Sequence, residues 1–292
     1  MIRFLVILLS ALSSSLASPN PIETLTMEPS LNMMRAELCY FKPSGKPRAV
    51  LVLAAGWNSR GDGLMGQTEW RVFATKNNLG LVGLSFASER PALLDGTGYY
   101  YASKGSGQLL LDGIERIFGE PLPLLLYGFS GGAHFTTRFV EWAPERVLGW
   151  CASGAGWYDK PTINPASPPG IISSGDEDLA YGPAIGYFMQ GRLEGKPWLW
   201  LPLANTDHII TPQLDSFARE YFSVILNANP KAGAHVDIHL RSLINEDAPK
   251  LTPKRTGFLP DRSLFEAWVA AQQPSLSNAS NAAIPDNAVT QP

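Results

Sequence analysis

Short apolar runs alternate with segments of helical spacing along most of the chain. The strand-like runs cover 36–41, 49–55, 79–85, 123–127, 147–153, 170–174 and 197–203. Apolar residues recur at helical spacing over 67–76, 109–118, 133–142, 182–193 and 212–227. Continuous apolar strands separated by helices are typical of a mostly parallel sheet that is buried on both faces. We therefore predict one doubly wound α/β domain over 36–270, with helices on both faces of the sheet.

The two ends of the chain depart from this pattern. Arg3, an apolar run over 4–12 and small residues ending at Ala17 follow the layout of a secretory signal peptide. The run is too short for a stable membrane span, and a buried N-terminal helix is the alternative. We expect residues 1–17 to be removed and the protein to be secreted or periplasmic, without a stable membrane anchor. Residues 272–292 are largely Ser, Asn, Ala and Pro, which predicts a disordered tail.

Charge and cysteine content narrow the possible partners. The formal net charge is −3, and no segment forms a basic face, so we expect no binding to nucleic acid. Cys39 and Cys151 are the only cysteines. They fall in strands that we expect to lie far apart in the sheet, which favours two separate buried thiols over a disulfide. The sequence does not decide between these two states, and it gives no oligomeric state.

The segment Gly128-Phe129-Ser130-Gly131-Gly132 lies between a predicted buried strand and a predicted helix. A serine at such a strand–turn–helix junction has the setting of a nucleophile elbow. The flanking glycines let the backbone turn sharply and pass close to neighbouring strands, so the hydroxyl projects from the sheet edge. The glycine spacing alone is a weak signal, but its setting makes Ser130 the candidate nucleophile.

A serine nucleophile needs a base, and the base needs an acid that orients it. The strand over 170–174 leads into an acidic loop in which Asp178 is the favoured acid and Asp176 the alternative. This loop could instead be solvated and cap the helix over 182–193. His208 follows the strand over 197–203, so nucleophile, acid and base come in the chain order of doubly wound hydrolases.

The other three histidines have different settings. His134 lies on the helix after Ser130, where we expect it to pack or to support the site. His235 and His239 flank Asp237 in an alternating segment, which predicts a strand with these polar residues outward and with Val236, Ile238 and Leu240 inward. A metal site built from the polar set is the less favoured alternative. We therefore expect no metal and no cofactor.

Acyl transfer also needs hydrogen-bond donors for the oxyanion. One candidate is the amide of Gly131, at the start of the helix that follows the nucleophile. The second donor should come from the loop after the strand over 49–55. The amide of Trp57 is favoured there and that of Asn58 comes second, although Trp57 could equally form an aromatic wall.

These motifs resemble the α/β-hydrolase superfamily, and within it the secreted carboxylesterases of the polyhydroxybutyrate-depolymerase, feruloyl-esterase and dienelactone-hydrolase-like group. The resemblance covers about 36–230 and implies an eight-strand-type sheet with a triad of Ser130, His208 and Asp178. Where many members have His-Gly after the first buried strand, this chain has Ala55-Gly56-Trp57. Dienelactone hydrolases proper use a cysteine nucleophile, so the serine argues against that activity.

Many members of the superfamily insert a helical lid after the strand that follows the elbow strand. Here the segment over 154–169 is too short and too rich in proline for a lid domain. An open site in an exported enzyme suits a bulky or polymer-attached ester. Trp157, Tyr158 and Tyr181 are candidates for its substrate-binding wall, and ordinary packing is the alternative for each.

Two other functions compete with the predicted serine carboxylesterase. Gly61, Gly63 and Gly66 match the spacing of a dinucleotide-binding loop, which would make the protein an oxidoreductase, but the strand ends too early for that turn. A hydrolase fold that serves only as a binding module is the second. The sequence leaves open the acyl and alcohol groups, and also whether the acyl group passes to water or to another alcohol.

Overall fold

The computed structural model describes residues 21–30, 32–164, 166–227, 233–245 and 252–274. The predicted signal peptide lies outside these residues, and so does the predicted tail from residue 275 onward. Both remain predictions.

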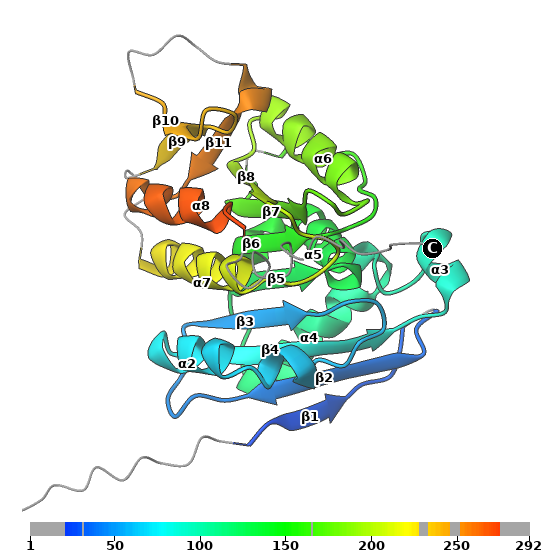
Figure 1. Ribbon diagram of the computed structural model, residues 1–292. Coiled ribbons are helices and arrows are strands. Elements are labelled where there is room, and N and C mark those ends of the chain that lie inside the picture. The colour runs from blue at the N-terminus through cyan, green and yellow to red at the C-terminus, as the bar shows by residue number, and fades with distance from the viewer. Residues whose placement is uncertain (1–20, 31, 165, 228–232, 246–251, 275–292) are drawn as a thin grey trace, which may run out of the picture.

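Eight strands form one sheet, as expected (Figure 1). They are β1 (Glu23–Thr26), β2 (Arg35–Phe41), β3 (Ala49–Ala54), β4 (Leu79–Ala87), β5 (Leu124–Phe129), β6 (Val147–Ser153), β7 (Gly170–Gly175) and β8 (Trp198–Leu203). Their order is β1-β2-β4-β3-β5-β6-β7-β8. The six strands β3 to β8 are parallel to one another. The strand β2 pairs antiparallel with both β4 and β1. The chain therefore has the predicted mostly parallel α/β sheet.

Helices cover both faces of this sheet (Figure 1). One face carries α2 (Thr68–Lys76) and α7 (Pro212–Asn227). The other carries α4 (Ser106–Phe118), α5 (Gly131–Trp142) and α6 (Tyr181–Leu193). These are the longer helices of the described chain, and their spacing is visible in the sequence. Two short helices, α1 (Asp62–Met65) and α3 (Arg90–Leu94), lie in the connections and were not predicted.

Large aromatic side chains fill the core on both faces. On the α2 and α7 face, the ring of Trp70 packs against Tyr127, whose hydroxyl donates to Asp215 of α7. On the opposite face, the rings of Trp150 and Trp198 meet edge to face. All four aromatic side chains are fully buried. Burial of rings this large contributes strongly to stability.

A second, three-stranded sheet lies beyond β8, and the sequence predicted only part of it. Its order is β10-β9-β11, and its strands are β9 (Ala234–Asp237), β10 (Ser242–Leu243) and β11 (Thr256–Leu259). The predicted strand over 233–240 ends early, at Asp237. Val236 and Ile238 are buried as expected, but Leu240 lies in a turn and is 70% exposed. Asp237 is buried rather than outward because it forms an ion pair with Arg255.

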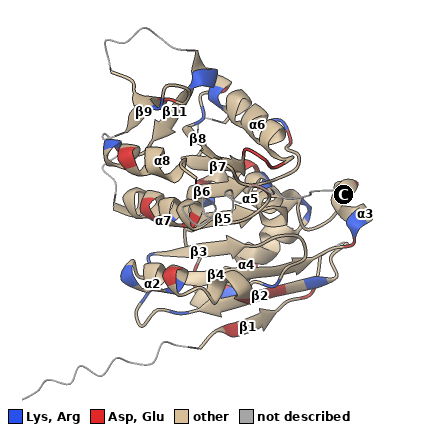
Figure 2. Cartoon of the chain, viewed as in Figure 1, with Lys and Arg blue, Asp and Glu red and all other residues tan. Residues whose placement is uncertain are grey.

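The chain continues into α8 (Phe265–Ala271), which packs beside α7 (Figure 1). No helix lies between β6 and β7 in the described residues, so the site has no lid in this part of the chain. No described helix combines the length and apolarity that crossing a membrane would require. Basic and acidic residues are interspersed over the described elements (Figure 2).

Two sequence features are explained by the fold. Cys39 of β2 and Cys151 of β6 are both buried and free, and β4, β3 and β5 separate their strands. Gly61, the first glycine of the dinucleotide-like motif, packs directly against the backbone of β4. A Cβ at this position would lie 2.2 Å from the carbonyl oxygen of Gly83 and would clash. This glycine is thus required for close packing between the loop and the strand.

Candidate active site

Ser130 lies in the tight turn between β5 and α5, where its φ of 52° and ψ of −115° are unusual for a residue with a side chain. The neighbouring glycines make this turn possible. A Cβ at Gly132 would lie 1.9 Å from the carbonyl oxygen of Ala54, and one at Gly128 would lie 2.4 Å from that of Gly132. The backbone of the turn is therefore pressed against the end of β3, and the Ser130 hydroxyl is presented at the carboxyl edge of the sheet.

The structure brings Ser130, His208 and Asp178 together, although they come from the ends of three different strands. His208 Nε2 lies 2.9 Å from Ser130 Oγ, and His208 Nδ1 lies 2.7 Å from Asp178 Oδ2. The His208 side chain is 42% exposed, whereas that of Asp178 is 6% exposed. The imidazole therefore bridges a buried carboxylate and an accessible hydroxyl.

The two loops that carry His208 and the acid are joined to each other. Glu177 N–H donates to the carbonyl of Thr206, and Thr206 N–H donates to Asp176 Oδ1. Asp176, the alternative acid, thus holds the histidine loop, while Asp178 faces the imidazole. Gly154 has a φ of 70° beside the pair, and a Cβ there would lie 3.1 Å from His208 Cε1. A glycine at this position leaves room for the imidazole.

The backbone of Gly131, directly after the elbow serine, lies against the backbone of Trp57 in the loop after β3. A Cβ at Gly131 would lie 2.7 Å from the backbone nitrogen of Trp57, so the two peptides are in direct contact. The amide of Asn58, the second choice, already donates to the hydroxyl of Tyr99 at 3.2 Å. This arrangement leaves the Gly131 and Trp57 amides as the candidate pair of oxyanion donors.

The candidate substrate-binding aromatics fall into two groups. Trp57 and Trp157 are 51% and 39% exposed, and Trp157 lies against the His134 ring. By contrast, Tyr158 stacks on Tyr187, and its hydroxyl oxygen is buried. Tyr181 packs edge to face on Trp200, with ring centroids 5.3 Å apart. The two tryptophans are therefore the more exposed aromatic side chains, whereas both tyrosines are half-buried and pack against the core.

His134 is buried one helical turn after Ser130 and supports the loop that follows β6. Its Nε2 accepts a hydrogen bond from Gly156 N–H at 3.2 Å, and its ring stacks on Tyr100. Burial, with the nearby Arg138 guanidinium second, lowers the pKa of His134 to about 3. This histidine is thus a neutral acceptor under most conditions, in line with the supporting role expected for it.

The described residues hold no group of three His, Cys, Asp or Glu side chains that could bind a metal ion. His235, Asp237 and His239, the alternative metal ligands suggested by the sequence, do not form such a group. Asp237 pairs with Arg255, and the His235 ring packs against Phe258.

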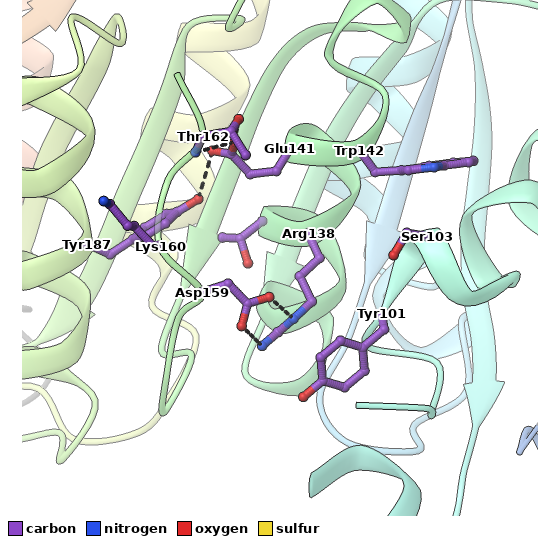
Figure 3. Close-up of a pocket in the computed structure, with 10 residues that line it drawn as sticks. Tyr101, Ser103, Arg138, Glu141, Trp142, Asp159, Lys160, Thr162 and Tyr187 are labelled. Carbon is purple, nitrogen blue, oxygen red and sulfur yellow. Dashed lines mark hydrogen bonds and ion pairs between the residues drawn. The ribbon is translucent and has the colours of Figure 1, made fainter. Parts of the chain in front are cut away.

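A separate cavity of about 280 Å³ lies further along α5, between that helix, the 3-10 turn over Ala102–Lys104 and the loop after β6 (Figure 3). Arg138 forms a two-point ion pair with Asp159, and Glu141 accepts hydrogen bonds from the backbone and hydroxyl of Thr162 (Figure 3). The charged groups between helix and loop are thus largely paired with each other. They hold the loop after β6 against α5.

Sequence reasoning missed the residues that fix the local backbone of the site. Phe129, whose ring lies 4.9 Å from that of His208, is only the variable residue of the elbow motif. Arg35 and Tyr99 contact the loop after β3 but come from distant segments. No signal in the sequence ties Arg35 to that loop, because the contact depends on the antiparallel placement of β2 beside β4.

Comparison with known proteins identifies the fold. No protein-family model and no curated protein matches the sequence. Among solved structures, the chain is similar to the substrate-bound fluorophosphonate-binding serine hydrolase F of Staphylococcus aureus, with a TM-score of 0.53 and 15% identity over 72% of this chain and 100% of that one. It is also similar to poly(aspartic acid) hydrolase-1 from Sphingomonas sp. KT-1, with a TM-score of 0.51 and 16% identity over 70% and 98%. A ferulic acid esterase matches with a TM-score of 0.51 and 12% identity over 71% and 96%. The chain has the α/β-hydrolase fold.

Proposed function

We propose that this protein is a serine hydrolase that cleaves carboxylic esters through an acyl-enzyme. The observation that carries the proposal is the continuous path from Ser130 Oγ through His208 to Asp178, with contacts of 2.9 and 2.7 Å. A strained elbow, beside which the backbones of Gly131 and Trp57 lie in contact, adds to it. The serine hydrolase and the ferulic acid esterase of the same fold named above support this chemistry.

In the first half of the reaction, Ser130 Oγ attacks the ester carbonyl while its proton passes to His208 Nε2. Asp178, which accepts from His208 Nδ1–H, stabilises the imidazolium that results. The amides of Gly131 and Trp57 donate to the oxyanion of the tetrahedral intermediate. His208 then gives the proton to the leaving alcohol oxygen. In the second half, water repeats the sequence on the acyl-enzyme and releases the acid.

The preferred substrate is a bulky or polymer-attached ester. The exposed imidazole of His208 and the absence of a lid in the described chain support this choice, because a large substrate can approach without a gate opening. Trp57 and Trp157 would contact it. The apolar side chains of Leu179 and Ile209, which directly follow Asp178 and His208, are 97% and 51% exposed and extend the apolar rim. We further propose that the enzyme acts outside the cytoplasm, after removal of residues 1–17.

The decisive experiment is labelling with a fluorophosphonate, followed by peptide mapping. We expect stoichiometric modification of Ser130, and turnover of at least one ester in a panel of p-nitrophenyl, feruloyl and polyester substrates. Ser130→Ala should lose both the label and the turnover, by about 10³-fold or more. Ser103→Ala is the control, because that serine lines the separate cavity on α5.

A hydrolase-fold binding module without activity is the alternative function. It predicts neither labelling nor turnover in the wild-type protein. Substantial turnover in Ser130→Ala would contradict the mechanism itself. An amide panel belongs in the same assay, because one protein of this fold named above is a poly(aspartic acid) hydrolase.

A further inference from the structure

The loop over 55–60, called here the oxyanion loop, carries the Trp57 amide, and Arg35 of β2 binds two of its carbonyl groups. Arg35 Nε donates to the carbonyl of Ser85 at 3.0 Å. Its Nη2 donates to the carbonyls of Asn58 and Ser59 at 2.6 and 3.0 Å. The planar guanidinium thus joins strand β4 to two successive peptides of the loop. An ammonium group could not match this forked arrangement.

Asn58 holds the other side of the same loop. Its backbone has a φ of 53°, a conformation that asparagine tolerates better than most residues. Its side-chain amide donates to the carbonyl of Ser88 at 3.0 Å and accepts from Ser88 N–H at 3.1 Å. Its own N–H donates to Tyr99 Oη. Burial raises the pKa of Tyr99, which therefore stays a neutral hydroxyl.

Trp57 lies directly before this fixed residue, and its amide nitrogen lies against Gly131. We infer that Arg35 and Asn58 are positioning residues that hold the Trp57 amide where the oxyanion forms. The inference rests on the proposed function. It explains how the chain supplies the second donor without the His-Gly that follows the first buried strand in many proteins it resembles. Here the loop is held by side chains from outside it and by one asparagine within it.

The test compares Arg35→Lys with Arg60→Lys. Arg60 links the same region to Glu37 of β2 through an exposed ion pair of 3.0 Å, which lysine can keep. With the best p-nitrophenyl ester of the panel, we expect Arg35→Lys to lower kcat about 10- to 100-fold, because a displaced oxyanion donor acts only on the transition state. KM should change less than about twofold. Arg60→Lys should retain kcat within about twofold.

Two further measurements separate positioning from a general loss of structure. Titration with a fluorophosphonate counts functional sites, so that kcat is expressed per titrated site. Inhibition by phenylboronic acid, which forms a tetrahedral adduct with the serine, should weaken by the same factor as kcat/KM falls. Asn58→Gly, which keeps the φ of 53° accessible, should show the same pattern. The double variant should lose less than the product of the single losses, because both residues act through one amide.

The inference is overturned if Arg35→Lys and Asn58→Gly retain full kcat per site. It also fails if Arg60→Lys loses as much as Arg35→Lys, or if phenylboronic acid binding is unchanged while kcat falls. A wild-type protein that neither labels nor turns over any ester would instead refute the proposed function. The two failures are therefore distinguishable.

Discussion

His134 shows how one buried side chain makes stability depend on pH. Its pKa of about 3 in the folded chain lies below the ordinary value of 6.5, because burial and Arg138 disfavour the charged ring. Tyr100 and Trp157 cover it, Gly156 N–H donates to it, and the Arg138 guanidinium is held by Asp159. Protonation of His134 therefore favours the unfolded chain.

The sign of the effect follows from these two pKa values. Above pH 6.5 the ring is neutral in both states, and its contribution is fully present. As the pH falls from 6.5 towards 3, the unfolded chain gains the proton first, so the free energy of unfolding decreases. We expect wild type to lose about 1 kcal/mol more per pH unit than His134→Gln in this window. Urea denaturation between pH 7 and pH 4 measures the difference. Parallel curves for the two proteins would contradict the assignment.

At the same scale, the sequence was sufficient to select the three residues of the candidate triad but not the residues that surround them. Ser130, Asp178 and His208 each follow a strand-like run, and parallel strands bring their carboxyl ends to one edge. That rule was sufficient to select three residues that meet in the structure. Tyr158 and Tyr181 followed the same rule, yet both are half-buried, and their rings pack on Tyr187 and Trp200. The direction of a ring depends on what it packs against, and a linear pattern does not carry that information.

At the scale of elements, α5 is joined to the start of β8 by a buried ion pair. Lys196 Nζ lies 2.9 Å from Glu141 Oε1, and the two side chains are 2% and 15% exposed. The ammonium also lies 5.1 Å from the centroid of the Trp198 ring. A buried charge is tolerated only while its partner is present.

Glu141→Gln should therefore lower the free energy of unfolding by about 3 kcal/mol, because Lys196 keeps its charge without a counterion. Addition of Lys196→Met should recover much of this loss. Glu120→Gln is the matched control, because Glu120 forms an ion pair with Lys46 at the surface. The side chains are 35% exposed for Glu120 and 75% for Lys46, so the loss of this pair should lower the free energy of unfolding by less than about 1 kcal/mol. Thermal or urea unfolding measures all three. Equal effects of Glu141→Gln and Glu120→Gln would disprove the role of burial.

Elements were predictable where they were long. The apolar runs of β3 to β8 and the spacing of α2, α4, α6 and α7 all have counterparts in the structure. Shorter elements such as β1, α1 and β10 have four residues or fewer, which is too few for a period of 2 or 3.6 residues to repeat recognisably. Their positions are set by neighbours in the fold. The same holds for Asp237, which is buried because Arg255 reaches it from another segment.

At the scale of the whole molecule, the proposed export can be tested directly. Expressed with its own N-terminus in a host with a secretory pathway, the protein should appear outside the cytoplasm with residues 1–17 removed. N-terminal sequencing or intact mass would reveal the new terminus at Ser18. A protein retained in the cytoplasm at full length would refute the proposal. A variant with Leu8 and Leu9 changed to Asp should stay uncleaved, because the apolar centre is interrupted.

The C-terminal part of the described chain determines how far this fold can be shortened. Trp268 Nε1–H donates to the carbonyl of Trp200 on β8, and Gly257 of β11 lies close to Leu199. These segments shield the last strand of the large sheet, beyond the last element of the predicted hydrolase pattern. A truncation after α7 would expose β8 as an unprotected edge strand. Strands of other molecules could then pair with it, and we expect oligomers or precipitate. A minimal soluble version of this hydrolase fold must therefore keep the chain through α8, even though every proposed catalytic group precedes residue 209.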